Sequence, residues 1–294
     1  MENLELTGFW WLPNEPNNKV FGNLNFNNQD GATLNLAGAF SPTPSLIRDS
    51  HGIILGFSTG GQKVTLYRNY QTNAQFLMPG MHTETYESSV IFCGAHFSNE
   101  ESLIFDSVSV VFTYFEDWLG VSGFEDEIQC DDGKMVCHTV SYRSPESSIA
   151  DVGNLQVVID YGYDTKRSGN EQIILRQVPH LKLKFAGSLG FDDMISSGLN
   201  SLQDFLAFAV DRPVFPTRLT VSSNEILQEI SRDDKSSSIP VTIRVYYKIH
   251  DMPQNTKTLV PFDMFFSYQE IEDDFQEVMR NWFQFLSDLR PVIN

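Results

Sequence analysis

Cysteine and histidine are the residues here that most readily bind metal ions or act as nucleophiles. The three cysteines are Cys93, Cys130 and Cys137, and Cys137 is followed directly by His138. Cys130 and Cys137 do not have the spacing of a zinc knuckle, and successive residues of a strand point to opposite faces. The sequence therefore predicts reduced thiols, no metal site and no cofactor.

Paired carboxylates are the next candidates, because they can act as general acids and bases. The groups are Asp131-Asp132, Asp192-Asp193, Asp233-Asp234 and the run Glu125-Asp126-Glu127. Each is expected in a turn or near a helix N-terminus, where acids are common for capping and solvation alone. We interpret them as structural residues.

The segment from Arg244 to His250 has the spacing of the Arg and His that hold phosphate and transfer protons in HEPN-type ribonucleases. The intervening residues alternate between apolar and polar types, which predicts a strand, whereas that motif belongs on a helix. We therefore expect no ribonuclease site in this chain.

A cluster of aromatic and amide residues near the N-terminus could recognise a ligand. Trp10 and Trp11 are followed by Asn14 and Glu15. Aromatic rings beside adaptable polar groups suit a binding surface, although large aromatic residues more often pack in a core. Both interpretations stay open, and these four residues are candidates for ligand or partner binding.

Charge and composition exclude several classes of function. The net charge is -18, with 38 acidic and 20 basic residues, and such a field repels phosphate backbones. We expect no direct binding of nucleic acid. The N-terminal residues include acids where a signal peptide is basic, and no apolar run reaches the roughly 18 residues of a membrane span. We expect a cytoplasmic chain without a membrane partner.

Alternation of apolar and polar residues with a period of two predicts a mostly β, α+β protein. The expected strands are 20–26, 32–38, 63–70, 89–97, 107–114, 134–142, 155–161, 171–178, 181–185 and 241–249. Asp30-Gly31 supplies a tight turn between the first two. Their spacing favours an antiparallel β-sandwich or an open barrel.

Two segments have helical periodicity instead, one over 192–210 and one at the C-terminal end. The second has an apolar face of Ile271, Phe275, Val278, Trp282, Leu286 and Leu289 after an acidic first turn. This face is large for a terminal helix, so we expect the rest of the chain, a second copy or an effector domain to cover it. Trp282 and Phe285 are partner-binding candidates.

The same patterns predict three consecutive parts of the chain. They are a β-rich subdomain over 1–150, a second β-rich subdomain with one helix over 151–267, and a C-terminal helix over 268–294. The polar segment 231–238 is the best linker candidate, because it has no apolar periodicity.

Three segments, Gly8 to Phe26, Gly94 to Phe124 and Leu202 to Val214, resemble the N-terminal domain of ApeA-like proteins. In that family, a β-rich domain precedes a C-terminal HEPN domain and acts in bacterial anti-phage defence. Residues 268–294 resemble the lead-in to the HEPN helices. The resemblance implies a non-catalytic sensor or regulatory domain that recognises a phage-derived protein or ligand and controls a HEPN ribonuclease effector.

Two alternatives remain. A β-sandwich module could bind carbohydrate or a small molecule through Trp10 and Trp11, which requires an exposed aromatic platform. A hydrolase could assemble its site from distant residues, which requires His51, His82 or His96 to meet several carboxylates.

Overall fold

The computed structural model describes residues 3–40, 49–75, 80–169, 171–232, 235–249, 259 and 263–293. The chain divides into two compact units, each made of three separate segments. The first is Met1–Val110, Phe185–Leu199 and Phe215–Thr256, and the second is Val111–Lys184, Asn200–Val214 and Lys257–Asn294. This interleaving differs from the consecutive parts expected from the sequence, because it depends on contacts between segments far apart in the chain.

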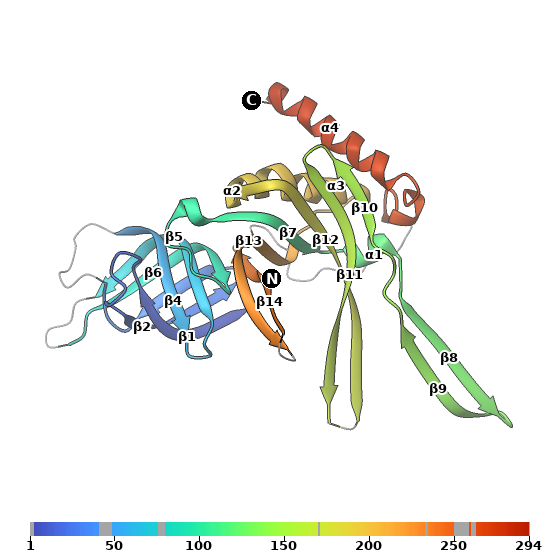
Figure 1. Ribbon diagram of the computed structural model, residues 1–294, viewed down its shortest axis with the longest axis horizontal. Coiled ribbons are helices and arrows are strands. Elements are labelled where there is room, and N and C mark those ends of the chain that lie inside the picture. Colours follow the sequence, from blue (N-terminus) through green and yellow to red (C-terminus); the bar gives the residue numbers. More distant parts are fainter. Residues whose placement is uncertain are drawn as a thin grey trace. The chain divides into compact units, whose positions relative to one another are not determined.

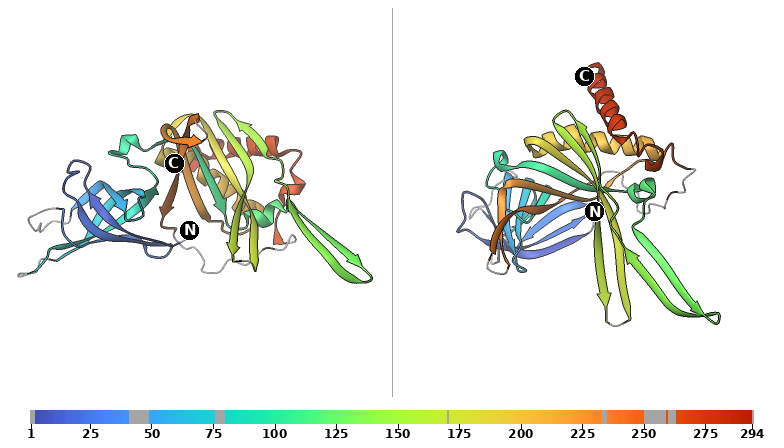
Figure 2. Two further views of the ribbon diagram at one scale, coloured as in Figure 1. Left: turned by 60° about the horizontal axis from the view of Figure 1, so that its bottom comes forward. Right: turned by 45° about the vertical axis from the view of Figure 1, so that its right-hand side comes forward.

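The first unit is built on a closed antiparallel barrel of six strands (Figures 1 and 2). They are β1 (Leu4–Trp11), β2 (Val20–Asn27), β3 (Gly31–Leu36), β4 (Ser50–Ser58), β5 (Lys63–Gln75) and β6 (Thr83–Cys93). The ring order is β1-β2-β3-β6-β5-β4, and β4 pairs back with β1. The mostly β prediction is confirmed, whereas the barrel is closed instead of open.

Alternation along the strands explains why the barrel core forms. In β2, Val20, Leu24 and Phe26 are buried on the inner face together with Gly22, and the alternate residues Phe21, Asn23 and Asn25 are exposed. Trp10 fills the space beside β4, where it lies opposite Gly56. A Cβ at Gly56 would lie 2.3 Å from the indole ring, so only glycine leaves room for this tryptophan.

Strand β6 connects the barrel to a sheet extension within the same unit. Its residues 84–88 pair with β3, and its residues 90–93 pair with β14 (Lys235–Tyr247). Strand β14 pairs in turn with β13 (Pro216–Arg232), which neighbours β7 (Ile104–Phe112). The linker prediction for 231–238 is wrong, because Ser231 pairs with Ser236 in the β13–β14 hairpin. Backbone pairing needs no apolar side chains.

The helix predicted over 192–210 forms, but it is interrupted. It consists of α2 (Phe191–Met194), a π-helical turn over Ile195–Leu199 and α3 (Asn200–Val210). The first two parts belong to the first unit and α3 belongs to the second. A short 3-10 turn, η1 (Glu100–Ser102), precedes β7.

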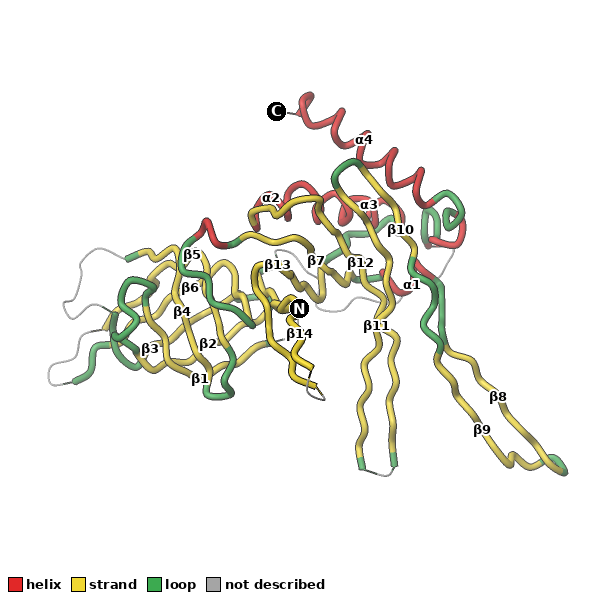
Figure 3. The backbone as a smooth tube through the Cα atoms, viewed as in Figure 1, coloured by secondary structure: helices red, strands yellow, loops and turns green. Residues whose placement is uncertain are grey.

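The described part of the second unit contains a sheet, a separate hairpin and several helices (Figure 3). The sheet strands are β10 (Ser148–Val152), β11 (Leu155–Ser168) and β12 (Gln172–Gly190), and β12 belongs to this unit up to Lys184. The helices are α1 (Phe115–Leu119), α3 and α4 (Phe275–Ile293). Trp118 of α1 is buried, and its ring contacts Phe205 of α3 and Tyr268.

The hairpin consists of β8 (Phe124–Asp131) and β9 (Lys134–Tyr142), with residues that are exposed almost throughout. Its turn has Asp132 and Gly133 in the left-handed region, as a two-residue hairpin requires. At its base, the N–H of Arg143 donates to the carbonyl oxygen of Gly123 at 2.9 Å. The hairpin projects from the rest of the second unit (Figure 1).

The C-terminal helix begins at Phe275, later than the predicted acidic first turn. The preceding segment forms the 3-10 turn η4 (Tyr268–Glu270), and Glu270 makes a capping box with Ser267. Hydrogen bonds from Ser267 lower the pKa of the Glu270 carboxyl. Within the described part of the chain, no helix has the length and apolar character needed to cross a membrane.

Candidate functional site

The structure places the two N-terminal tryptophans in the barrel and not on a platform. Trp10 is fully buried and its Nε1 donates to the carbonyl oxygen of Gly22 at 3.2 Å. Trp11 is also buried, with its ring edge-to-face against His96. Burial of both rings removes the exposed surface that a carbohydrate-binding platform would need.

Asn14 and Glu15 are exposed in the loop after β1. A carboxylate oxygen of Glu15 accepts a hydrogen bond from Asn18 Nδ2 at 3.1 Å. Glu15 is one of three carboxylates that act on His51, together with Asp49 and Glu84. The loop therefore contributes to a polar cluster instead of extending an aromatic surface.

The cluster around His51 is a buried hydrogen-bonded network of the first unit. Glu84 is buried, and its Oε2 accepts from Tyr86 Oη at 3.1 Å and from the N–H of Phe40 at 2.9 Å. Tyr86 Oη lies 3.5 Å from His51 Nε2. Burial lowers the pKa of His51, although the nearby carboxylates oppose that shift. The polar atoms of Glu84 and Tyr86 thus satisfy one another.

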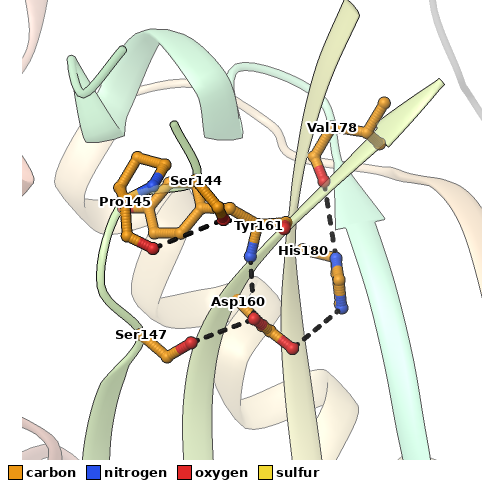
Figure 4. A network of polar contacts seen from close by, with 7 residues as sticks. All are labelled: Ser144, Pro145, Ser147, Asp160, Tyr161, Val178 and His180. Atoms are coloured by element: carbon orange, nitrogen blue, oxygen red, sulfur yellow. Dashed lines mark hydrogen bonds and ion pairs between the residues drawn. The ribbon is translucent and has the colours of Figure 1, made fainter. Parts of the chain in front are cut away.

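A second network joins serine, aspartate and histidine in the second unit (Figure 4). Ser147 Oγ donates to Asp160 Oδ1 at 2.9 Å, and His180 Nε2 lies 3.9 Å from Asp160 Oδ2. In a nucleophilic triad, the imidazole lies between the hydroxyl and the carboxylate. Here, the carboxylate lies between the other two, so His180 is not placed to take a proton from Ser147. The network secures the chain before β10 to β11.

The cysteines and acidic groups are dispersed. Cys93 is buried, whereas Cys130 and Cys137 are exposed on the β8–β9 hairpin. His138 of that hairpin pairs with Asp126, which lies on a strand and not in the turn expected for it. Among the described residues, no three His, Cys, Asp or Glu side chains gather as a metal site. Asp233, Asp234 and His250 lie outside the described residues.

The remaining predicted candidates, Trp282 and Phe285, lie on an exposed cluster of aromatic rings in the second unit. We define the aromatic surface as Phe208 of α3, Phe265 and, from α4, Trp282 and Phe285. Phe208 lies 5.3 Å from Phe265 and stacks on Trp282 at 6.0 Å between ring centroids. Trp282 contacts Phe285 at 5.9 Å. The four rings therefore form one continuous surface.

Buried residues in the first half of α4 hold that helix in place. Phe275 and Met279 are 3% and 1% exposed. Gln276 binds the backbone of Asp151 twice, donating to its carbonyl oxygen at 2.8 Å and accepting from its N–H at 2.7 Å. Further along the helix, Leu286 and Leu289 are only half-buried. Of the predicted apolar face, Phe275 is thus buried. The other members are half-buried, namely Ile271, Val278, Trp282, Leu286 and Leu289.

Contacts with the end of α3 and the residues after it hold the segment of Phe265 in place. The N–H of Phe265 donates to the carbonyl oxygen of Ala209, at the end of α3, at 2.8 Å. Arg212 Nη2 lies 3.4 Å from Asp263 Oδ2, which ties the same segment to α3. Sequence periodicity missed Phe208 and Phe265, because Phe208 lies off the core face of its helix and Phe265 belongs to no helical pattern.

The aromatic surface has the properties of a protein-binding site. Phe208, Phe265 and Phe285 are 52%, 71% and 52% exposed. Exposed apolar groups that adjoin one another, in contrast to scattered ones, mark interaction sites. Aromatic residues held in fixed positions lose little conformational entropy on binding and often dominate the binding energy.

Comparisons with known proteins identify the family of this chain. The model of one family, described as ApeA N-terminal domain 1, matches residues 5–282. Searches of curated proteins and of solved structures found no match. The matched range includes the barrel, the second-unit sheet and most of the aromatic surface, and the chain therefore belongs to the ApeA N-terminal domain 1 family.

Proposed function

We propose that this chain is a non-catalytic sensor and regulatory domain of an anti-phage defence protein. In this proposal, it recognises a phage-derived protein or ligand and controls a HEPN ribonuclease effector. Family membership supports the association with defence. The observation that carries the regulatory role is the aromatic surface, whose rings are held in place yet left open to a partner.

The proposed occupant of the aromatic surface is the C-terminal HEPN effector domain. The family model describes an N-terminal domain, so proteins of this family have further domains to contact. The surface lies on the α4 helix, which resembles the lead-in to the HEPN helices. Helices with apolar faces pack well against exposed aromatic residues, as in helical bundles.

His51 lies near several carboxylates, as the hydrolase alternative requires, but the hydrogen bonds of these polar groups support a non-catalytic role. Glu84 and Tyr86 are occupied by hydrogen bonds beside His51, and Asp160 separates Ser147 from His180. Neither cluster provides a hydroxyl held by a free base, which nucleophilic hydrolysis needs. The two buried tryptophans likewise disfavour a carbohydrate-binding module.

The test is binding between this chain and the separately purified HEPN domain of the same defence protein, measured by isothermal titration calorimetry. Replacing Phe265 and Phe285 by serine should weaken binding at least tenfold, because it removes two exposed aromatic anchors. A matched control replaces Phe9 and Phe57, which are 49% and 45% exposed and pair across β1 and β4 of the barrel.

The control variant should bind as tightly as the wild type. Equal binding by both double variants would overturn the proposed docking site. A second outcome would also count against the proposed docking site. If the isolated chain forms dimers, and the Phe265/Phe285 variant loses the dimers but keeps HEPN binding, the occupant of the aromatic surface is a second copy of the chain.

A further inference from the structure

A cavity opens in the first unit where β6 changes its pairing partner. Ala32, near the start of β3, pairs with Ser88, and Tyr247, at the end of β14, pairs with Val90. The two partner strands separate at Ser89. The resulting cavity has a volume of about 420 Å³, which is within the usual range for small-molecule sites. Phe191 and Ile195 form another wall.

Three departures from regular backbone structure converge on this cavity. Arg68 has a φ of 57° within β5, and Gly31 has a φ of 84° at the start of β3. The π-helical turn begins at Ile195. A non-glycine residue in the left-handed region is strained, and such strain is concentrated at functional sites. π-Helical turns are also frequent there.

Some charges in the cavity wall are already neutralised. Arg68 Nη2 lies 2.6 Å from Asp192 Oδ2, and the guanidinium also lies 4.7 Å from the centroid of the Tyr67 ring. Asp30 Oδ2 accepts a hydrogen bond from Asn27 Nδ2 at 2.9 Å. Arg68 and Asp192 thus neutralise each other, whereas Asp30 keeps its charge and has one oxygen occupied by Asn27. Lys248 and Glu87 are the charged groups of the wall for which the described part of the chain provides no partner.

Lys248 and Glu87 are both exposed and both line the cavity. Neither makes an ion pair with any residue in the described part of the chain. The stem of Lys248 packs beside Gly31, where a Cβ would lie 3.4 Å from its Cδ. Glu87 pairs across the sheet with Tyr70. The cavity thus offers one ammonium and one carboxylate.

The wall between these charges is partly apolar. Phe191 and Val90 are buried, and Ile195 is half-buried. Tyr247 adds a ring whose hydroxyl makes no hydrogen bond with a described residue, and burial raises its pKa. An apolar wall with a few polar groups of opposite charge is typical of sites that orient a small ligand.

We propose that this cavity binds a small zwitterion, namely a free amino acid or a short peptide with an apolar side chain. Lys248 receives the ligand carboxylate, Glu87 receives the ammonium, and Phe191 and Ile195 contact the side chain. A polyphosphate fits less well, because three carboxylates and only two cations line the cavity. A purely cationic ligand would leave Lys248 unpaired.

This inference goes beyond the proposed function and does not depend on it. All residues that line the cavity belong to the first unit, whereas the proposed effector-docking surface lies on the second. Loss of HEPN binding therefore says nothing about the zwitterion, and loss of zwitterion binding says nothing about HEPN docking.

The test screens the twenty standard amino acids and a set of apolar dipeptides by thermal shift, followed by calorimetry on the full chain. At least one zwitterion should bind saturably, and its N-acetylated, C-amidated form should bind at least about tenfold more weakly. Lys248→Met and Glu87→Gln should each weaken binding by about tenfold or more. Both side chains are exposed, so we expect these variants to fold.

Lys63→Met and Glu5→Gln are matched controls, because both residues are exposed in the same unit and neither lines the cavity. They should leave binding unchanged. The proposal is overturned if no amino acid or dipeptide binds, or if the capped form binds as tightly as the free form. Saturable binding of AMP or ATP, lost in Lys248→Met and kept in Glu87→Gln, would instead assign the cavity to an anion.

Discussion

The indole Nε1 of Trp282 donates a hydrogen bond to the carbonyl oxygen of Ser201 at 2.8 Å, which joins α4 directly to α3. The same side chain also makes ring contacts with Phe205 and Phe208. Phenylalanine keeps a ring but lacks the indole N–H, so substitutions can measure the hydrogen bond and the ring packing separately.

Trp282→Phe should lower the free energy of unfolding by about 1 kcal/mol, since it removes the hydrogen bond and keeps an aromatic ring. Trp282→Ala should lower it by about 3 kcal/mol, since it also removes the packing. Urea unfolding followed by circular dichroism measures both. Equal losses in the two variants would show that ring packing contributes nothing there.

Gly56→Ala should destabilise the barrel by about 2–3 kcal/mol, because the new Cβ would collide with the Trp10 ring at 2.3 Å. Gly60→Ala is the matched control, with 3.7 Å to its nearest neighbouring atom, and should be close to neutral. The midpoints of urea denaturation compare the two. A stable Gly56→Ala protein would mean that Trp10 can leave its site at little cost.

Stability should fall as the pH is lowered below about 6.5. Burial lowers the folded-state pKa of His51 and of His96, so the unfolded chain takes up protons first. The free energy of unfolding therefore decreases as the pH falls from about 6.5, the pKa of histidine in the unfolded chain, to the lower pKa values of these histidines in the folded protein. The His51→Gln/His96→Gln variant should show a smaller change in urea midpoint between pH 7.5 and pH 5.5.

That comparison uses the wild-type chain as its control, because the two proteins differ only at these two histidines. The carboxylates of Asp49, Glu84 and Glu15 raise the pKa of His51 and so oppose the effect of burial. We therefore expect His51 to contribute less to the loss of stability at low pH than burial alone would give. Parallel pH profiles for the two proteins would contradict the prediction.

Two of the three thiols should react quickly with a disulfide reagent such as Ellman's reagent. Cys130 and Cys137 are exposed, whereas burial raises the pKa of Cys93 to about 12 and removes its thiolate at neutral pH. The third thiol should react only after denaturation. A Cys93→Ala variant that loses one of the fast-reacting thiols would show that the barrel opens readily.

Strand periodicity predicted much of this fold, and its failures have physical causes. Strand β8 was missed because Glu125, Asp126 and Glu127 are unfavourable in buried strands, and this hairpin is exposed on both faces. Strand β4 was missed because its apolar residues are consecutive. Barrel closure depends on the pairing of β1 with β4, and no local pattern encodes a register between distant strands.

The sequence likewise indicated some residues of the candidate sites and missed others. Helical spacing made Trp282 and Phe285 candidates for partner binding, because both lie on one regular helix, and that role stays a prediction. It could not identify the cavity, because Glu87 lies on β6 whereas Lys248 follows the end of β14, far away in the sequence. Only the change of pairing partner along β6 brings them together.

The β8–β9 hairpin offers a place to modify this protein without disturbing its core. Its two ends are held together at the base by the Arg143–Gly123 backbone bond, and Gln177 binds the backbone of both Gly123 and Val121. Because these contacts lie below the exposed ribbon, its tip at Asp132 and Gly133 should accept an inserted epitope or fluorophore tag. The tip of the β8–β9 hairpin is thus a suitable insertion site for tags used to image or capture the intact protein.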